Sequence, residues 1–146
     1  MTPPPRPAGV TRRLASGLYE LLILLAVVFI ATLPFSYAFG DATHGWRRHL
    51  LQAWVFFVVG AYFLWFWTHG GQTLPLKTWR LRVLRQDGTP VRWPQALHRY
   101  GLSLLSFFAV GLGFWWAFFD REKLFLHDRL AGTYIADANA ALPPKA

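Results

Sequence analysis

Residues 14–40 read LASGLYELLILLAVVFIATLPFSYAFG, and this stretch decides the fold. Its only charged residue is Glu20. A helix of roughly 20 predominantly apolar residues crosses the ~30 Å hydrocarbon core of a bilayer. The stretch is too long for a secretory signal, ends in the aromatic Pro34-Phe35-Ser36-Tyr37 cluster and lacks a small-residue cleavage site. It therefore predicts a membrane helix that stays on the mature protein.

Two further apolar stretches lie at residues 51–67 and 100–119. Hydrophobic residues make up 54% of the chain and charged residues only 15%, which is too apolar for an ordinary soluble domain. We therefore predict an all-α integral membrane protein in a lipid bilayer. It has two transmembrane helices plus a third apolar segment, which is either re-entrant or spanning.

The stretch at 70–99 is the most polar part of the chain, and two of its segments alternate polar and apolar side chains. These segments are residues 79–84 and 89–93, and Asp87-Gly88 between them is typical of a tight turn. We therefore predict a small cytoplasmic β-hairpin here. Residues 133–137 also alternate and can add a third strand, because an isolated two-stranded hairpin is only marginally stable in water.

Positive residues help to choose the path of the third apolar segment. Three lie in the amino tail, two in the first loop, six in 70–99 and four after the third segment. A spanning third segment puts nine on one side and six on the other, whereas a turn near Gly111-Leu112-Gly113 puts thirteen against two. Cytoplasmic loops carry the excess of Lys and Arg. The bias favours a re-entrant segment and a cytoplasmic amino terminus at the cell inner membrane.

We expect one membrane domain at residues 12–137 between disordered tails at 1–11 and 138–146, since both ends are Pro- or Ala-rich without apolar periodicity. The chain has no cysteine and no histidine pair at metalloprotease spacing, so we expect no metal site and no cofactor. Hydrolase and nucleotide-binding motifs are also missing, and we expect no catalytic residues. The net charge is +8, and the Lys and Arg residues flank apolar helices. Positive residues in these places fit a role in setting membrane topology and in binding anionic lipid headgroups better than a role in binding nucleic acid.

Glu20 is the most informative residue, because an ionisable side chain inside a membrane helix is costly and often serves an ion pathway or a proton relay. Arg13 lies seven residues earlier, on the same helix face and about 10 Å along the axis. Asp128 approaches Arg13 if the chain turns back. We predict a buried network of these three residues that binds a cation or passes a proton, or, alternatively, a static ion pair that locks the helices. The supporting residues surround Asp128: His127, Arg129, Gly132 and Thr133.

A family resemblance runs from residue 12 to residue 135. Its motifs are Arg12-Arg13-Leu14, Leu18-Tyr19-Glu20, Gly71-Gln72-Thr73-Leu74, Trp79-Arg80-Leu81-Arg82-Val83, Asp87-Gly88, Gly111-Leu112-Gly113-Phe114-Trp115 and His127-Asp128-Arg129-Leu130-Ala131-Gly132-Thr133. Together they resemble the RDD family of membrane proteins, which is named for one Arg and two Asp. The resemblance implies that the family's Arg is Arg13 and its second Asp is Asp128. Two positions depart from it: Glu20 replaces the first Asp, and Pro75 stands where similar sequences usually have Gly.

The RDD resemblance implies transport, including cation/proton antiport in some members. We predict a transporter of Na⁺, K⁺, Li⁺ or H⁺, in which Glu20 is the protonatable site, Asp128 a second acidic ligand and Arg13 their counter-charge. Because one copy can hardly enclose a path, we expect a homo-oligomer with small residues as close-packing points: Gly60, Gly111 and Gly113. The alternative is a non-transporting scaffold or accessory protein whose charge network is structural.

Overall fold

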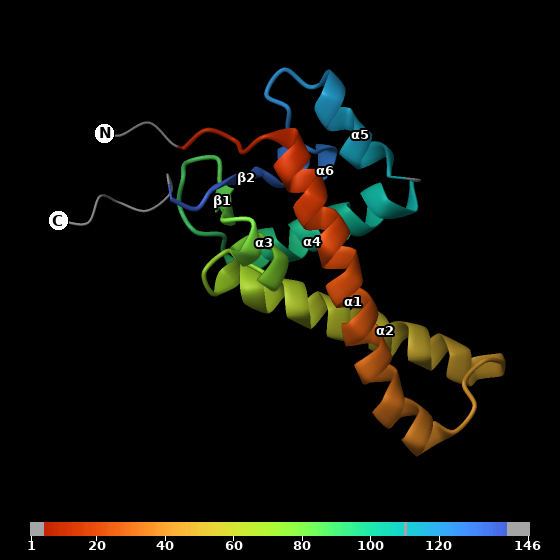
Figure 1. Ribbon diagram of the computed structural model, residues 1–146. Coiled ribbons are helices and arrows are strands. Elements are labelled where there is room, and N and C mark those ends of the chain that lie inside the picture. Colours follow the sequence, from red (N-terminus) through yellow and green to blue (C-terminus); the bar gives the residue numbers. More distant parts are fainter. Residues whose placement is uncertain (1–4, 110, 140–146) are drawn as a thin grey trace.

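The computed structural model describes residues 5–109 and 111–139, which form a mostly helical protein with a two-stranded sheet at one end (Figure 1). In chain order the elements are α1 (Val10–Phe39), α2 (Gly45–Thr68), α3 (Leu74–Thr78), β1 (Leu81–Arg85), α4 (Trp93–Phe108), α5 (Leu112–Phe119), α6 (Leu126–Ala131) and β2 (Thr133–Asp137). The predicted fold class is confirmed in its helices: two are long and apolar enough to cross a membrane, and the third apolar segment is bent. Pro7 already forms a bridge to Ala136, so described structure begins before the predicted domain boundary at residue 12. Residues 1–4 and 140–146 of the two predicted tails lie outside the described residues.

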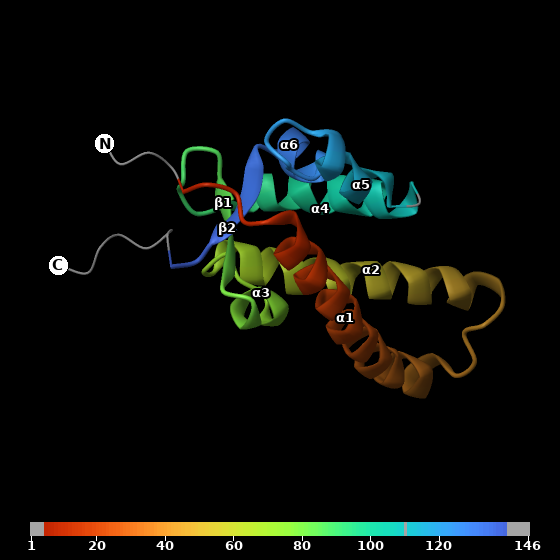
Figure 2. The same cartoon turned by 45° about the horizontal axis from the view of Figure 1, so that its top comes forward.

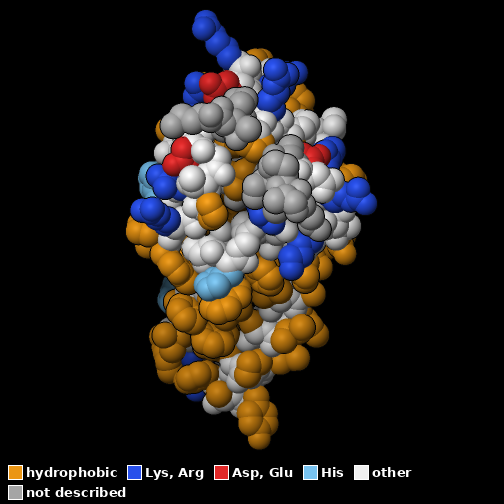
Figure 3. Space-filling model, turned by 90° about the vertical axis from the view of Figure 1, so that its left-hand side faces the viewer, with side chains coloured by type: hydrophobic (Ala, Val, Ile, Leu, Met, Phe, Trp, Pro, Cys, Tyr) orange, Lys and Arg blue, Asp and Glu red, His pale blue; other side chains and the backbone are white. Residues whose placement is uncertain are grey.

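Helices α1 and α2 form the membrane hairpin. Their 30 and 24 residues correspond to about 45 Å and 36 Å, enough to cross ~30 Å of hydrocarbon. Gly40, at a φ of 70°, ends α1, and the chain returns antiparallel, with Trp54 Nε1 donating to the Ala31 carbonyl at 2.9 Å. Figure 3 shows apolar side chains over this half of the molecule and most of the charged ones over the other half. The hairpin therefore presents its apolar surface to lipid.

Strand β1 pairs antiparallel with β2, in a register that places Val83 opposite Ile135. The predicted third strand is thus the partner of β1, and the predicted hairpin with residues 89–93 is wrong. The Asp87-Gly88 turn is present, but beyond it only Pro90 bridges back, to Leu84. Pro90 has no N–H to continue a ladder, and Pro94 in the first turn of α4 favours a helix start.

The third apolar segment forms α4 and α5, which are bent by 95° relative to each other. Gly111, at a φ of 72°, supplies the left-handed residue before α5. Figures 1 and 2 show α4 running beside α2, with α5 and α6 leading back toward the sheet. Because β1 precedes α4 and β2 follows α6, their pairing returns the chain to the end of the molecule at which α4 begins. The re-entrant path requires this return.

Two glycines allow close contacts within the chain. A methyl group at Gly60 of α2 would lie 3.0 Å from Cε1 of Tyr100 on α4, and one at Gly113 of α5 would overlap the side chain of Ser106. Both predicted close-packing points therefore pack against other helices of the same copy. At Gly111 a methyl group would have no neighbour within 4 Å.

The sheet end carries the apolar core. Leu81, Val83 and Ile135 from the two strands pack with Trp67 of α2 and Phe125 before α6. Gly71 holds β1 from the other side: its carbonyl accepts a hydrogen bond from Val83 N–H at 2.8 Å, and a methyl group there would lie 2.6 Å from the Val83 carbonyl. This core fixes the ends of α1, α4 and α6 around one site.

Candidate functional site

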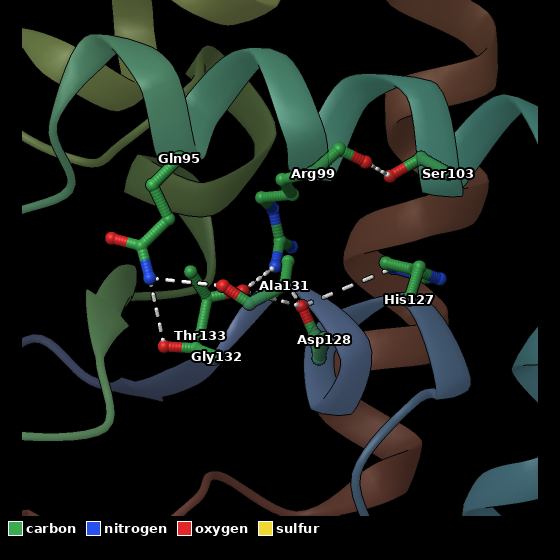
Figure 4. A network of polar contacts seen from close by, with 8 residues as sticks. All are labelled: Gln95, Arg99, Ser103, His127, Asp128, Ala131, Gly132 and Thr133. Atoms are coloured by element: carbon green, nitrogen blue, oxygen red, sulfur yellow. Dashed lines mark hydrogen bonds and ion pairs between the residues drawn. The ribbon is translucent and has the colours of Figure 1, made fainter.

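Arg99 and Asp128 form a buried ion pair between α4 and α6 (Figure 4). Arg99 is 3% exposed and Asp128 is fully buried. Arg99 Nη1 donates to Asp128 Oδ1 and to Thr133 Oγ1, the latter at 2.6 Å, and the guanidinium lies over the Trp67 ring with Cζ 4.8 Å from its centroid. Charge-assisted hydrogen bonds are stronger than those between neutral groups, and burial strengthens them further.

The local sequence explains why these groups meet. Gln95, one turn before Arg99 on α4, donates from Nε2 to the carbonyls of Ala131 and Gly132 at 2.9 Å and 3.0 Å (Figure 4). It thereby satisfies carbonyls at the carboxyl end of α6, which a helix leaves without internal partners. Gly132, at a φ of 66°, turns the chain into β2 and brings Thr133 beside Asp128.

Arg13 of α1 is 2% exposed but does not pair with Asp128. Its Nη2 donates to the Lys123 carbonyl, and its Cζ lies 4.8 Å from the centroid of the Phe125 ring. Its Nε and Nη1 are buried without a hydrogen-bond partner, and no ion pair of Arg13 occurs among the described residues. The predicted contact between Arg13 and Asp128 is therefore wrong, because Arg99 takes the carboxylate.

Glu20 has a different set of partners. Tyr62 of α2 donates its hydroxyl to Oε1 at 2.8 Å, and Thr73, at the start of α3, donates to Oε2 at 2.5 Å. Thr73 is fully buried and Glu20 is partly buried. No described Lys, Arg or His forms an ion pair with Glu20. Two neutral hydroxyls thus hold a membrane carboxylate that pairs with no described cationic side chain.

One cavity of about 730 Å³ connects the predicted site residues. Arg13, Glu20, Arg99 and His127 all line it, and Asp128 lies behind Arg99. The rest of its wall is mostly apolar and comes mainly from α1, α2, α4 and α5. The structure therefore brings the predicted residues to one place, but as two separate clusters.

The other supporting residues differ in their surroundings. Burial, with the positive charges of Arg99 and Arg13, holds the pKa of His127 well below its usual value of 6.5. His127 Nε2 lies 4.0 Å from Asp128 Oδ1. Arg129 instead pairs with Asp120, away from this cluster, and is exposed. No group of three His, Cys, Asp or Glu able to hold a metal ion occurs in residues 5–109 and 111–139.

A family model described as the RDD family matches residues 7–132. The chain belongs to the RDD family. The predicted resemblance is confirmed, and the range matched to the RDD model includes Arg13, Glu20 and Asp128. Comparison with curated proteins gave no match, and comparison with solved structures gave none either.

Sequence reasoning missed three site residues of this RDD protein: Tyr62, Thr73 and Arg99. Arg99 had been counted only among the positive residues that set topology, although it stands directly before the apolar run at 100–119. This position was the available signal, because a charged residue at the boundary of an apolar run needs a partner. Tyr62 and Thr73 gave no signal, because only the packing of α1 against α2 and α3 brings their hydroxyls to Glu20.

Proposed function

We propose that this RDD protein is a cation- or proton-coupled membrane transporter, with Glu20 as the group that exchanges a proton or binds the cation. The observation that carries the proposal is the surroundings of Glu20: it accepts from two hydroxyls and lines a mostly apolar cavity, and no described cationic side chain forms an ion pair with it. An ionised carboxylate in an apolar site is costly unless it is paired or neutralised. A proton, or Na⁺, K⁺ or Li⁺, would supply the missing charge.

The proposal gives Arg13 and Asp128 roles other than ligands. Asp128 accepts from Arg99 and holds α6 to α4, so it supports the wall of the cavity rather than a transported ion. Arg13 lines the same cavity about 10 Å along α1 from Glu20. Its positive charge limits how many cations the cavity accepts at once.

The orientation and assembly form part of the same proposal. The pairing of β1 with β2, and of Pro7 with Ala136, puts the amino tail, the 70–99 stretch and the carboxyl segment at one end. Arg47 and Arg48 at the start of α2 lie at the other end. The positive-inside rule then supports a cytoplasmic amino terminus at the cell inner membrane. A homo-oligomer would complete the transport path that two helices and a re-entrant segment leave open.

Proton flux in proteoliposomes tests the proposal. The vesicles carry an acidic interior and a trapped pH-sensitive dye, and Na⁺, K⁺ or Li⁺ is added outside. We expect the wild type to dissipate the gradient on addition of at least one cation. Glu20→Gln keeps an acceptor for the two hydroxyls but cannot exchange a proton, and should abolish the flux while remaining folded.

The matched control is Glu122→Gln, which makes the same chemical change at an exposed position. It should transport like the wild type. The proposal would be contradicted if well-folded wild type gave the same dye signal as empty vesicles in all three salts, with no response to the added cation. Equal flux from Glu20→Gln and wild type would show transport that does not use Glu20.

A second candidate function, a non-transporting scaffold or accessory protein, is favoured by the Arg99–Asp128 pair. A fully buried pair that joins α4 to α6 is the arrangement that a static lock needs. Under this alternative Glu20→Gln lowers stability or assembly, and no variant gives flux. Melting temperatures recorded on the same preparations separate the two functions.

A further inference from the structure

At the head of the cavity two guanidiniums, Arg13 and Arg99, lie near one carboxylate, Asp128, and the other carboxylate in the lining, Glu20, is about 10 Å away along α1. Arg13 and Arg99 lie close enough to repel each other electrostatically, and Asp128 is the only described carboxylate that pairs with either of them. Arg13 keeps Nε and Nη1 buried and unpartnered while it lines the cavity. A buried guanidinium in this state is costly, because two of its three nitrogens donate no hydrogen bond and no described carboxylate pairs with its charge. The site therefore suits an anion.

The length of the cavity and the placing of its polar and apolar residues also suit an amphiphilic ligand. Its lining follows one face of α1 from Arg13 to Leu24 and one face of α4 from Arg99 to Phe108. Eleven residues of helix correspond to about 16 Å, close to the roughly 15 Å depth of one leaflet of hydrocarbon. The wall below the arginines is mostly apolar, and its polar residues are Ser16, Glu20, Tyr100 and Ser103.

The cavity opens toward the lipid-facing surface. Leu18 and Phe108 line it, yet each is 66% exposed. Gly17, between the arginine end and Glu20, has no side chain to close the wall, and a methyl group there would meet nothing within 4 Å. An acyl chain can therefore enter sideways from the bilayer, which a path for a small soluble anion would not require.

We propose that this cavity binds an anionic phospholipid, with its phosphate at Arg13 and Arg99 and an acyl chain along α1 and α4. The phosphate supplies the missing negative charge, and its oxygens can accept charge-assisted hydrogen bonds from a guanidinium. The lipid shields the polar end of the cavity from hydrocarbon. The phosphate end of this site lies about 10 Å along α1 from Glu20, and the acyl chain runs past Glu20 toward Leu24. Its test measures bound lipid and no flux, so it stands or fails separately from the transport proposal.

Native mass spectrometry of delipidated protein in neutral detergent tests the lipid site. The protein is offered equal amounts of dioleoyl phosphatidylglycerol and dioleoyl phosphatidylcholine, and the ratio of bound lipids is measured. We expect the anionic lipid to be preferred by the wild type, and Arg13→Gln to lower the preference about tenfold, the loss of one charge-assisted contact. Arg92→Gln removes the same charge from an exposed position and should leave the ratio unchanged.

A second pair of variants keeps every charge and tests the part of the site that holds the acyl chain. Gly17→Leu fills the cavity, whereas Gly101→Leu makes the same change at a helical glycine that does not line it and also has free space. Only Gly17→Leu should lose bound phosphatidylglycerol. This pair decides the question if Arg13→Gln fails to fold.

Three results would overturn the lipid site. The first is inorganic phosphate displacing phosphatidylglycerol at equal concentration, because the ligand is then a small anion. The second is an equal loss in Arg92→Gln and Arg13→Gln, which assigns the preference to general surface charge. The third is wild-type binding by Gly17→Leu.

Discussion

Asp128 and Glu20 are both acidic residues beside one apolar cavity, but they differ in what holds them. Asp128 is fully buried and accepts from the charged Arg99, whereas Glu20 is partly buried and accepts from the neutral hydroxyls of Tyr62 and Thr73. Neutralising Asp128 leaves a buried guanidinium without its partner. Neutralising Glu20 leaves only hydroxyls, which can accept as well as donate. Asp128 thus has the surroundings of a structural carboxylate, and Glu20 has those that the proposed exchange of charge requires.

Asp128→Asn should give the largest loss of stability. Breaking a buried pair by removing one partner typically costs about 3 to 5 kcal/mol, because the other charge stays buried and uncompensated. We expect a strongly lowered melting temperature in detergent. Glu122→Gln, at an exposed site, should melt like the wild type.

The double variant Asp128→Asn/Arg99→Met sharpens this result. It removes the unpaired guanidinium and should recover part of the stability that Asp128→Asn loses. A double variant less stable than the single one would show that the guanidinium is held by Trp67 and Thr133 rather than by Asp128.

His127 should make the Asp128 cluster sensitive to acid. Its native pKa is held well below 6.5 by burial and by the charges of Arg99 and Arg13, although Asp128 lies 4.0 Å away. Below pH 6.5 the unfolded chain takes up a proton that the native state does not, so stability falls by about 1.4 kcal/mol for each further pH unit. The melting temperature should therefore fall as the pH is lowered below 6.5.

Melting temperatures measured across this pH range test the His127 prediction. His127→Phe should flatten the pH dependence, because the new ring packs with Phe114 and Phe125 and does not titrate. His98→Phe, at an exposed position, should keep the wild-type slope. A slope that His127→Phe leaves unchanged would assign the acid sensitivity to other groups.

Much of the fold was predictable because lipid leaves the backbone few choices. A long apolar stretch in a membrane satisfies its own hydrogen bonds as a helix, so residues 14–40 and 51–67 had to lie within helices close to α1 and α2. The partner of β1 was not fixed by local pattern. Residues 89–93 and 133–137 alternate equally well, and only Pro90 argued against the nearer one.

The acidic residues of the site could be predicted from the sequence, but the residues that pair with them could not. Glu20 and Asp128 were singled out because a carboxylate among apolar residues is costly. Which cation meets Asp128 depends on the packing of α4 against α6, and in the sequence Arg99 differs from the other five positive residues at 70–99 only in standing directly before the apolar run at 100–119. Residue types alone could not decide between Arg13 and Arg99.

Thr73→Val should cost about 1 kcal/mol, the usual net worth of one buried hydrogen bond. The change keeps the shape of the side chain but removes the hydroxyl that donates to Glu20. Thermal melting measures the loss, and Thr78→Val, at an exposed position, is the control. In a Glu20→Gln background the same change should cost less, since the acceptor is then uncharged; an equal cost would show that Thr73 acts through its packing alone.

Glu20→Gln should have the smallest effect on stability, below about 1 kcal/mol. The amide keeps one oxygen acceptor, and its NH₂ group can donate to the hydroxyl oxygen of Tyr62 or Thr73, so neither hydroxyl is left unpartnered. No buried cation loses its counter-charge, since none of the described cationic side chains pairs with Glu20. Melting curves taken beside those of Asp128→Asn give the decisive difference. If the two variants lost equal stability, Glu20 would be as structural as Asp128. The fold alone would then explain why residue 20 carries a carboxylate. If Glu20→Gln hardly changes the melting temperature, stability does not explain the unpaired carboxylate in this membrane helix, and function is the remaining reason for it.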